Sequence, residues 1–283
     1  MVKIKTALEI GIERLVKREY NNPMLEVKLL LAYVLGMDKN ELFFRLEEEI
    51  SDEKLNEFYT LLEKRVKGYP IQYIIGNQEF MGLDFKVEEG ILIPRPDTEV
   101  LVENIIKIAE NRYKGKIIRI LDLCTGSGAI AISLAKYLSN SLVDAVDISD
   151  SAIEIARHNA IKNRVDDRVN IIKSDLFENI KRKYNIIVSN PPYIETETID
   201  SLQIEVSEYE PRIALDGGKD GLKFYKEIIK QSVNYIEEDG ILGFEIGHNQ
   251  GKIVSELMNI DFYNIEIIKD LAKNDRVVIG YMK

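Results

Sequence analysis

Apolar residues recur at helical spacing through the first 70 positions of the chain. One segment opens at Asn22, a residue type favoured as an N-cap, and ends at Gly36, where a left-handed cap is expected. A second segment opens at Ser51 and stops before Gly68 and Pro70. The apolar positions of the two segments are Leu25, Leu29, Ala32, Tyr33, Leu55, Phe58, Leu62 and Val66. The pattern predicts a small all-helical domain over residues 1–76, with the apolar stripes as its core.

The hydrophobic period changes after this helical part. Short runs on either side of a glycine turn predict a β-hairpin linker over residues 77–92. A loop framed by prolines follows, and it leads into a helix from Val100, with Asp97 or Thr98 as the N-cap. Arg95 stands between two prolines, and we expect it to hold a fixed position rather than to be an exposed linker residue.

Strand-like runs alternate with helical segments from residue 117 onward. The expected strands are Ile117–Leu123, Leu142–Ile148, Val169–Lys173, Tyr184–Ser189, Ile241–Glu245, Ile265–Lys269 and Val277–Tyr281. This alternation predicts an α/β domain over residues 93–283, with a seven-stranded, mostly parallel sheet and helices on both faces. The last two strands are joined too closely for a helical crossover, so we expect the final strand to insert antiparallel.

The composition is that of a globular protein, with 283 residues, 45% hydrophobic and 30% charged. The longest uncharged apolar stretch, Leu29–Leu35, is far shorter than the roughly 20 residues of a membrane span. Residues 1–6 lack the apolar core of a signal peptide, so we expect a cytoplasmic protein. A single cysteine, Cys124, excludes an internal disulfide, and His158 and His248 form no ligand cluster, so we expect no structural metal.

The formal net charge is −10, and the excess acid is unevenly spread. Residues 1–75 hold 12 Lys and Arg against 13 Asp and Glu, so nearly all the excess lies in the second domain. Proteins that bind duplex nucleic acid usually present a basic face, because counterion release from phosphates supplies most of their affinity. The charge pattern therefore favours a protein or small-molecule substrate.

A glycine turn follows the first predicted strand of the sheet and opens a helix. Gly126 and Gly128 let the backbone turn sharply and approach a ligand, and the helix N-terminus adds a positive end. With Ala131, and with Asp147 about 20 residues on, they also satisfy a dinucleotide fingerprint, so an NAD-dependent oxidoreductase is an alternative. Asp122 favours another ligand, because a carboxylate beside the turn repels a pyrophosphate but attracts the cationic amino end of S-adenosylmethionine, directly or through water.

Two further carboxylates follow the next predicted strands. Asp147 suits the ribose hydroxyls, and Asp175 suits the adenine amino group, with Leu176 as an apolar neighbour. Alternatively, each aspartate only caps a helix or starts a turn. Carboxylates at three successive strand ends favour a nucleoside cofactor, and we expect S-adenosylmethionine. The expected cofactor residues are Asp122, Cys124, Thr125, Gly126, Ser127, Gly128, Asp147, Asp175, Leu176 and Asn190. We interpret Cys124 as a packing residue rather than a nucleophile.

The tetrapeptide Asn190-Pro191-Pro192-Tyr193 closes the predicted buried strand Tyr184–Ser189. Ligands of open α/β sheets bind beyond the carboxyl ends of the strands. The Asn190 side-chain oxygen and the Pro191 carbonyl are two acceptors for a planar N–H₂ group, and neither proline has an N–H to compete. Tyr193 supplies a flat wall. We interpret the tetrapeptide as a clamp for an amide or exocyclic amine nitrogen about to be alkylated; the alternative is a plain Pro-rich turn.

These motifs lie in longer blocks that resemble the HemK/PrmC protein-glutamine methyltransferases, which modify peptide chain release factors. The blocks cover residues 22–36, 70–76, 79–80, 93–99, 122–128, 189–194, 209–215, 245–247 and 274–278. The Asn-Pro-Pro-Tyr motif is shared with adenine and guanine amino-methyltransferases, but its combination with Ile93–Glu99 and Tyr209–Leu215 is much more specific. Cys124 departs from the family, which commonly has glycine there.

The resemblance implies a helical substrate-recognition domain, a β-hairpin linker and a Rossmann-like class I methyltransferase domain. It also implies methyl transfer from S-adenosylmethionine, with S-adenosylhomocysteine as product, to the glutamine of the Gly-Gly-Gln motif of class 1 release factors. The catalytic residues are then Asn190, Pro191 and Tyr193, and Pro192 joins them in binding the substrate.

The segment over residues 194–219 is expected to cover the substrate, with Glu210, Pro211 and Arg212 shaping that cover; an ordinary connecting loop is the alternative. Arg95, Glu210 and Arg212 are expected to support the site. We expect a monomer that makes no stable complex with nucleic acid or membrane. An amino-methyltransferase of RNA or DNA bases is the nearest alternative enzyme, since it would use the same clamp on an exocyclic amine.

Overall fold

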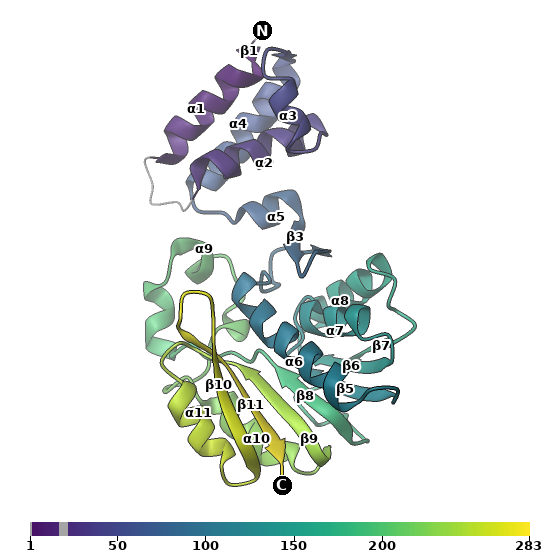
Figure 1. Ribbon diagram of the computed structural model, residues 1–283. Coiled ribbons are helices and arrows are strands. Elements are labelled where there is room, and N and C mark those ends of the chain that lie inside the picture. Colours follow the sequence, from purple (N-terminus) through teal and green to yellow (C-terminus); the bar gives the residue numbers. More distant parts are fainter. Residues whose placement is uncertain (1, 17–21) are drawn as a thin grey trace. The chain divides into compact units, whose positions relative to one another are not determined.

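The computed structural model describes residues 2–16 and 22–283, and the chain divides into two compact units, residues 1–76 and 77–283 (Figure 1). Residue 1 and residues 17–21 of the predicted helical domain lie outside the described residues. Among the helices of the described part, none is both long and apolar enough to cross a membrane.

The first unit is mainly helical, but it also holds a short antiparallel pair of strands that the prediction of an all-helical domain did not include. Its elements are β1 (Val2–Lys3), α1 (Ile4–Val16), α2 (Pro23–Leu35), α3 (Glu41–Phe44), β2 (Glu49–Ile50), α4 (Asp52–Val66) and α5 (Ile71–Ile75). Asn22 caps α2 by accepting a hydrogen bond from the Leu25 N–H, and Gly36 ends α2 with a left-handed φ of 66°. Ser51 caps α4 by accepting from the Lys54 N–H. These cap predictions are confirmed.

A buried ion pair joins α2 to α4 inside the first unit. Arg65 is only 1% exposed, and its Nε and Nη2 donate to the two carboxylate oxygens of Glu26 at 2.7 and 3.1 Å. The two parallel bonds fix the planar guanidinium in one orientation. Because both charges are withdrawn from water, each depends on the other for its stabilisation.

Glu26→Gln is expected to lower the free energy of unfolding of the first unit by about 3 kcal/mol, because it leaves a buried guanidinium without its counter-charge. Urea denaturation followed by circular dichroism measures this loss. Glu57→Gln is the matched control, since it breaks the exposed pair of Glu57 with Lys54 and should cost less than about 1 kcal/mol. Equal losses in the two variants would contradict the argument from burial.

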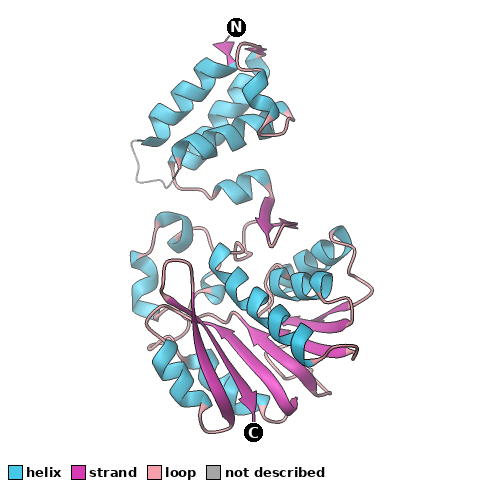
Figure 2. Cartoon of the chain, in the orientation of Figure 1, coloured by secondary structure: helices cyan, strands magenta, loops and turns pink. Residues whose placement is uncertain are grey.

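The second unit is a sheet between two layers of helices (Figure 2). Its strands are β3 (Asn77–Phe80), β4 (Leu83–Lys86), β5 (Ile118–Leu123), β6 (Ser141–Asp147), β7 (Val169–Lys173), β8 (Tyr184–Ser189), β9 (Ile236–Glu245), β10 (Phe262–Lys269) and β11 (Asp275–Met282). Its helices are η1 (Pro96–Thr98), α6 (Glu99–Arg112), α7 (Ala129–Tyr137), α8 (Asp150–Lys162), η2 (Thr196–Ser201), α9 (Ile204–Ser207), η3 (Arg212–Ala214), α10 (Lys223–Ser232) and α11 (Gly251–Met258).

The large sheet has seven strands in the order β10-β11-β9-β8-β5-β6-β7. Strands β5 to β9 pair in parallel, and β11 pairs antiparallel with both β9 and β10. The mostly parallel sheet and the antiparallel insertion of the last strand are thereby confirmed. Strands β9 and β10 begin earlier than predicted, at Ile236 and Phe262, because shifts in their pairing register interrupt the alternation of apolar and polar residues.

Helices cover both faces of this sheet, and β5 runs through its middle. The core on one face contains residues of α6, α7 and α8, and the core on the other contains residues of α10 and α11. Strand β5 contributes side chains to both cores, with Ile118 and Ile120 in the first core and Leu121 and Leu123 in the second. Since β5 has β6 on one side and β8 on the other, its carboxyl end lies at the point where the strand order reverses, which is where ligands bind in such sheets.

The predicted β-hairpin is formed by β3 and β4, which pair antiparallel. Phe80 and Phe85 pack edge to face, with ring centroids 6.0 Å apart, and both belong to the core with α6, α7 and α8. The Lys86 N–H donates to Asn159 Oδ1 at 2.7 Å, which ties the hairpin to α8. The hairpin is therefore built into the second unit.

Candidate active site

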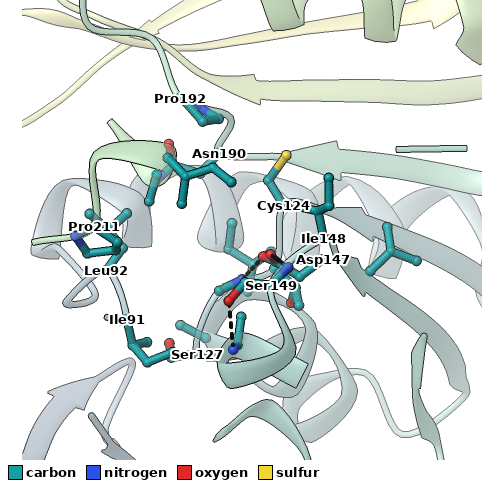
Figure 3. Close-up of a pocket in the computed structure, with 18 of the residues that line it drawn as sticks. Ile91, Leu92, Cys124, Ser127, Asp147, Ile148, Ser149, Asn190, Pro192 and Pro211 are labelled. Carbon is teal, nitrogen blue, oxygen red and sulfur yellow. Dashed lines mark hydrogen bonds between the residues drawn. The ribbon is translucent and has the colours of Figure 1, made fainter. Parts of the chain in front are cut away.

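A cavity of about 300 Å³ opens beyond the carboxyl ends of β5, β6 and β8. Its walls come from residues 90–95, the loop after β5, the ends of β6 and β7, the tetrapeptide after β8, the start of α10, and Pro211, Ile213 and Ala214. Figure 3 shows Asn190 and Pro192 on one side of the cavity and Asp147 and Ser149 on another. The volume and the largely apolar wall are those of a small-molecule site.

Asp147 holds the glycine loop against the end of β6. Its Oδ2 accepts a hydrogen bond from the Gly126 N–H at 2.8 Å, and its Oδ1 accepts from the Ser149 N–H at 3.0 Å (Figure 3). Burial raises the pKa of Asp147, and these backbone bonds act in the opposite direction. The cap of α8 is Ser149, which accepts from the Ala152 N–H, so the alternative that Asp147 is only a helix cap is wrong. Asp147 presents a fixed carboxylate to the cavity.

Asp122 lies beneath the loop, fully buried, and is not part of the cavity wall. Its Oδ2 accepts from the Thr125 hydroxyl at 2.5 Å and from the Ala131 N–H, in the first turn of α7, at 3.2 Å. Its Oδ1 is buried and receives no hydrogen bond from the described residues. Burial raises the pKa of Asp122 to about 7. A positive charge on a ligand above the loop would stabilise the ionised form of this carboxyl.

Cys124 has a backbone conformation that favours glycine. Its φ is 59°, in the left-handed region, which costs an L-residue roughly 1–2 kcal/mol. The glycine that is common in the HemK/PrmC family adopts this conformation without that cost. Burial raises the pKa of the Cys124 thiol, so the sulfur stays protonated. The thiol therefore lines the cavity without being activated as a nucleophile.

The part of the wall that follows β6 and β7 is mixed in polarity. Asp175, Leu176 and Ile148 line the cavity, as does Phe224 at the start of α10. Sequence reasoning did not select Ile148 or Phe224. No motif marks them, because only the folding of the chain brings them to the cavity.

The backbone of the tetrapeptide is held from behind by residues far along the chain. Gln250 is 7% exposed, and its Nε2 donates to the carbonyl oxygens of Tyr193 and Gly221 at 3.0 and 3.3 Å. Gly217 packs on the same segment, since a Cβ there would lie 2.7 Å from Tyr193 Cα and 2.9 Å from the Pro192 oxygen. Only glycine fits at that distance, so the backbone of residue 217 packs directly on the tetrapeptide.

Two side chains of the tetrapeptide reach buried partners. Asn190 Nδ2 donates to Thr98 Oγ1 at 3.3 Å, which turns the amide oxygen of Asn190 away from Thr98. The Tyr193 hydroxyl donates to Glu245 Oε1 at 3.2 Å. Thr98 and Glu245 were not predicted as site residues from the sequence. Their position within the blocks that resemble the HemK/PrmC family was the feature of the sequence that could have indicated such a role.

Glu245 ends β9 and is 1% exposed. Burial raises its pKa to about 7, whereas the Thr98 hydroxyl, Arg276 and Tyr193 act to lower it. Arg276 itself pairs with Asp97 and Asp270 at 3.1 and 3.2 Å. Glu245 is therefore a buried acid whose protonation state changes near neutral pH.

A second buried acid fixes the segment over residues 194–219. The side chain of Glu210 is 1% exposed, and both of its carboxylate oxygens lie 2.6 Å from Arg95 Nη2. Arg95 thus joins the loop before α6 to the segment over residues 194–219. Arg212 has a different place, because it pairs with Asp200 at 2.9 Å on the exposed side of that segment.

The structure brings most of the predicted site residues to this cavity, but not all of them. Those in its wall are Arg95, Cys124, Thr125, Gly126, Ser127, Asp147, Asp175, Leu176, Asn190 and Pro192. Those outside the wall are Asp122, Gly128, Pro191, Tyr193, Glu210 and Arg212.

The predicted N-cap of α6, Asp97 or Thr98, is wrong, since no side chain caps the start of that helix. Across residues 2–16 and 22–283, no cluster of three His, Cys, Asp or Glu side chains is arranged to hold a metal ion.

The strand order, the antiparallel β11 and the cavity beside a glycine loop define a Rossmann-like methyltransferase. A family model described as "Methyltransferase small domain" matches residues 96–206, and one described as "PrmC N-terminal domain" matches residues 6–76. A solved methyltransferase from Pyrococcus furiosus has the same fold, with a TM-score of 0.54 at 16% identity over 78% of this chain and 98% of that one.

The curated relatives identify the family. A release factor glutamine methyltransferase of Clostridium acetobutylicum is 43% identical over 284 residues, which cover 99% of this chain and 98% of that protein. One of Fusobacterium nucleatum is 43% identical over 274 residues, covering 95% and 76%. The chain therefore belongs to the release factor glutamine methyltransferase family. The predicted family, fold and enzyme class are confirmed, and the oxidoreductase alternative is wrong.

The raised pKa of Glu245 predicts a stability that falls as pH rises. Well below its ordinary pKa of 4.5 the group is protonated in the folded and unfolded states and costs nothing; above about 7 it is ionised in both, and its burial costs up to about 3 kcal/mol. Glu245→Gln removes this cost. The unfolding free energy of the variant minus that of the wild type should therefore increase by about 3 kcal/mol between pH 4.5 and pH 8, measured by urea denaturation.

Glu256→Gln is the matched control for this experiment, because it neutralises an exposed carboxylate on α11 that pairs only loosely with Lys252, at 3.9 Å. It should leave the pH dependence unchanged. A Glu245→Gln difference that stays constant with pH would show that the buried carboxyl does not titrate in this window.

Proposed function

We propose that this protein transfers the methyl group of S-adenosylmethionine to the side-chain amide nitrogen of the glutamine in the Gly-Gly-Gln motif of class 1 release factors. The observation that carries this proposal is the orientation of Asn190, whose amide nitrogen is bound to Thr98 and whose oxygen is therefore left to accept a hydrogen bond at the cavity wall. The names of the curated relatives support the release factor as substrate.

The residues of the cavity fit S-adenosylmethionine as the methyl donor. Asp147 accepts from the ribose hydroxyls, and Asp175 and Leu176 receive the adenine. Asp122 Oδ1, buried and without a hydrogen-bond partner among the described residues, is the electrostatic counterpart of the cationic amino end. When bound, the donor supplies an electrophilic methyl group on a sulfonium.

The tetrapeptide acts on the amide nitrogen of the substrate, which is a weak nucleophile because its lone pair is delocalised into the carbonyl. Asn190 Oδ1 and the Pro191 carbonyl accept its two hydrogens and direct the nitrogen toward the methyl group. Positive charge grows on that nitrogen during alkylation, so both acceptors bind more tightly in the transition state than in the ground state. Tyr193 packs on the amide plane. The alkylated amide is acidic enough to release its proton to water, so no strong general base is needed.

Recognition of the protein substrate is shared between the two units. The helical unit holds the release factor, and the segment over residues 194–219, fixed by the Arg95–Glu210 pair, covers the target side chain. Glycines that flank the target let a bare backbone enter a narrow site. The enzyme works as a cytoplasmic monomer. An amino-methyltransferase of nucleic-acid bases would use the same clamp, but the acidic balance of the second unit disfavours such a substrate.

Incubation with methyl-labelled S-adenosylmethionine and a purified bacterial class 1 release factor is expected to label the release factor, with mass spectrometry locating the methyl group on the tip glutamine. A release factor with that glutamine replaced by alanine should stay unlabelled. Equal labelling of the two, or preferential labelling of RNA or DNA, would contradict the proposal.

Asn190→Ala is expected to lower kcat on the same substrate by about 10²–10³, because it removes a preorganised acceptor that binds the amide most tightly in the transition state. Circular dichroism should show an unchanged fold. Asn111→Ala, which truncates an exposed asparagine of α6 bonded to the Lys107 carbonyl, is the matched control and should keep wild-type turnover. Near-normal turnover of Asn190→Ala would refute the clamp.

A further inference from the structure

A buried asparagine of α8 joins the glycine loop after β5 to the β-hairpin. Asn159 is fully buried, and its Nδ2 donates to the Ser127 carbonyl at 2.9 Å and to the Lys86 carbonyl at 3.0 Å. Its Oδ1 accepts from the Lys86 N–H at 2.7 Å. Both hydrogens of the carboxamide and its oxygen are therefore bonded to backbone groups. An apolar side chain of the same size would leave those buried groups without a partner.

Both partners of Asn159 lead directly into the wall of the cavity. Ser127 belongs to the glycine loop and lines the cavity, as does Ile91 (Figure 3). Lys86 is the last residue of β4, and the chain that follows it lines the cavity over residues 90–95. One side chain thus makes a hydrogen-bonded link between the glycine loop and the strand that leads into a second part of the wall.

The same face of α8 packs on both segments. Ile91 forms a buried cluster with Ala152 and Ile155. A Cβ at Gly128 would lie 3.3 Å from the Ala156 Cβ, so the helix also lies close against the glycine loop. Residues three, four and seven positions apart share one face of a helix. The packing contacts and the carboxamide bonds therefore come from one side of α8.

The Asn159 side chain lies outside the cavity wall, so it acts on a ligand through the segments that it holds. Asp147 accepts from the Gly126 N–H within the wall, and Asn159 holds the Ser127 carbonyl from outside it. A loop that is already fixed needs little ordering when a ligand binds, whereas a loose loop must be ordered at a cost to affinity. We propose that Asn159 is a positioning residue of the methyl-donor site, which holds the glycine loop and residues 90–95 as one preformed wall. This inference rests on the proposed methyl donor.

Asn163 is the matched control, because it follows Asn159 by one helical turn and also bonds the hairpin. Its Nδ2 donates to the Asp84 carbonyl at 3.1 Å, and within the described residues none of its hydrogen bonds reaches the glycine loop. We expect Asn159→Leu to raise the Kd for S-adenosylmethionine about tenfold or more in isothermal titration calorimetry, because the loop loses a bond that holds it before the donor arrives. Asn163→Leu should keep that Kd within about twofold of wild type.

Two results of the titration would overturn the inference: a Kd of Asn159→Leu within about twofold of wild type, or equal increases in the two variants, which would assign the effect to the hairpin alone. Hydrogen exchange followed by NMR tests the loop without any cofactor. The amides of residues 126–131 should exchange about tenfold faster in Asn159→Leu than in the wild type or in Asn163→Leu, because the loop opens more easily. Equal rates in the three proteins would also overturn the inference.

Hydrogen exchange of the wild type alone decides the question if Asn159→Leu does not fold. S-adenosylmethionine should slow the exchange of the Lys86 N–H, which is bonded to Asn159, since a donor that orders the loop also orders the carboxamide. An unchanged rate at Lys86 in the presence of bound donor would contradict the inference. If the wild type binds no S-adenosylmethionine but the loop of Asn159→Leu exchanges faster, the proposed methyl donor fails and the positioning of the loop stands.

Discussion

The parallel pairing of β5 with β8 is the interaction on which the site depends. In this register Leu123 lies opposite Ser189, and the Ser189 hydroxyl donates to the Leu123 carbonyl at 2.8 Å. The glycine loop and the Asn190 tetrapeptide therefore leave the sheet side by side. A slip of one residue would turn the side chains of β8 to the opposite face and break the alignment of the two loops. The glycine loop and the tetrapeptide are adjacent because two strands are in register.

The segment over residues 95–99 is the second feature that fixes the geometry of the site. Its polar side chains join parts of the second unit that are distant in sequence. The pairs are Arg95 with Glu210, Asp97 with Arg276, Thr98 with Asn190 and Glu99 with the Met81 N–H. The segment thus connects the segment over residues 194–219, the last strand, the tetrapeptide and the hairpin. What the sequence presents as the start of a helix is a junction, and this explains why none of its side chains caps α6.

Two buried carboxyls lower the free energy of unfolding of this protein when they are ionised. Burial raises the pKa of both Asp122 and Glu245 to about 7, so each destabilises the folded protein when ionised. Asp122 lies under the glycine loop, and Glu245 lies behind the tetrapeptide. Acids in such positions are typical of functional sites, where a ligand charge or an oriented hydrogen bond compensates the loss of water. Both carboxyls therefore make the folded protein less stable at neutral pH than at acidic pH.

The sequence by itself determined the helix caps at Asn22 and Ser51, the strand succession and the order of the glycine loop and the tetrapeptide, because period, capping and turn chemistry depend on residues a few positions apart. Resemblance to the family added the enzyme class. Only the tertiary structure decided that Asp122 lies under the cavity rather than in its wall, that Gln250 holds the tetrapeptide, and that Thr98 meets Asn190. The last two pairs are 57 and 92 residues apart, and no local pattern encodes a hydrogen bond between groups that come together only when the chain has folded.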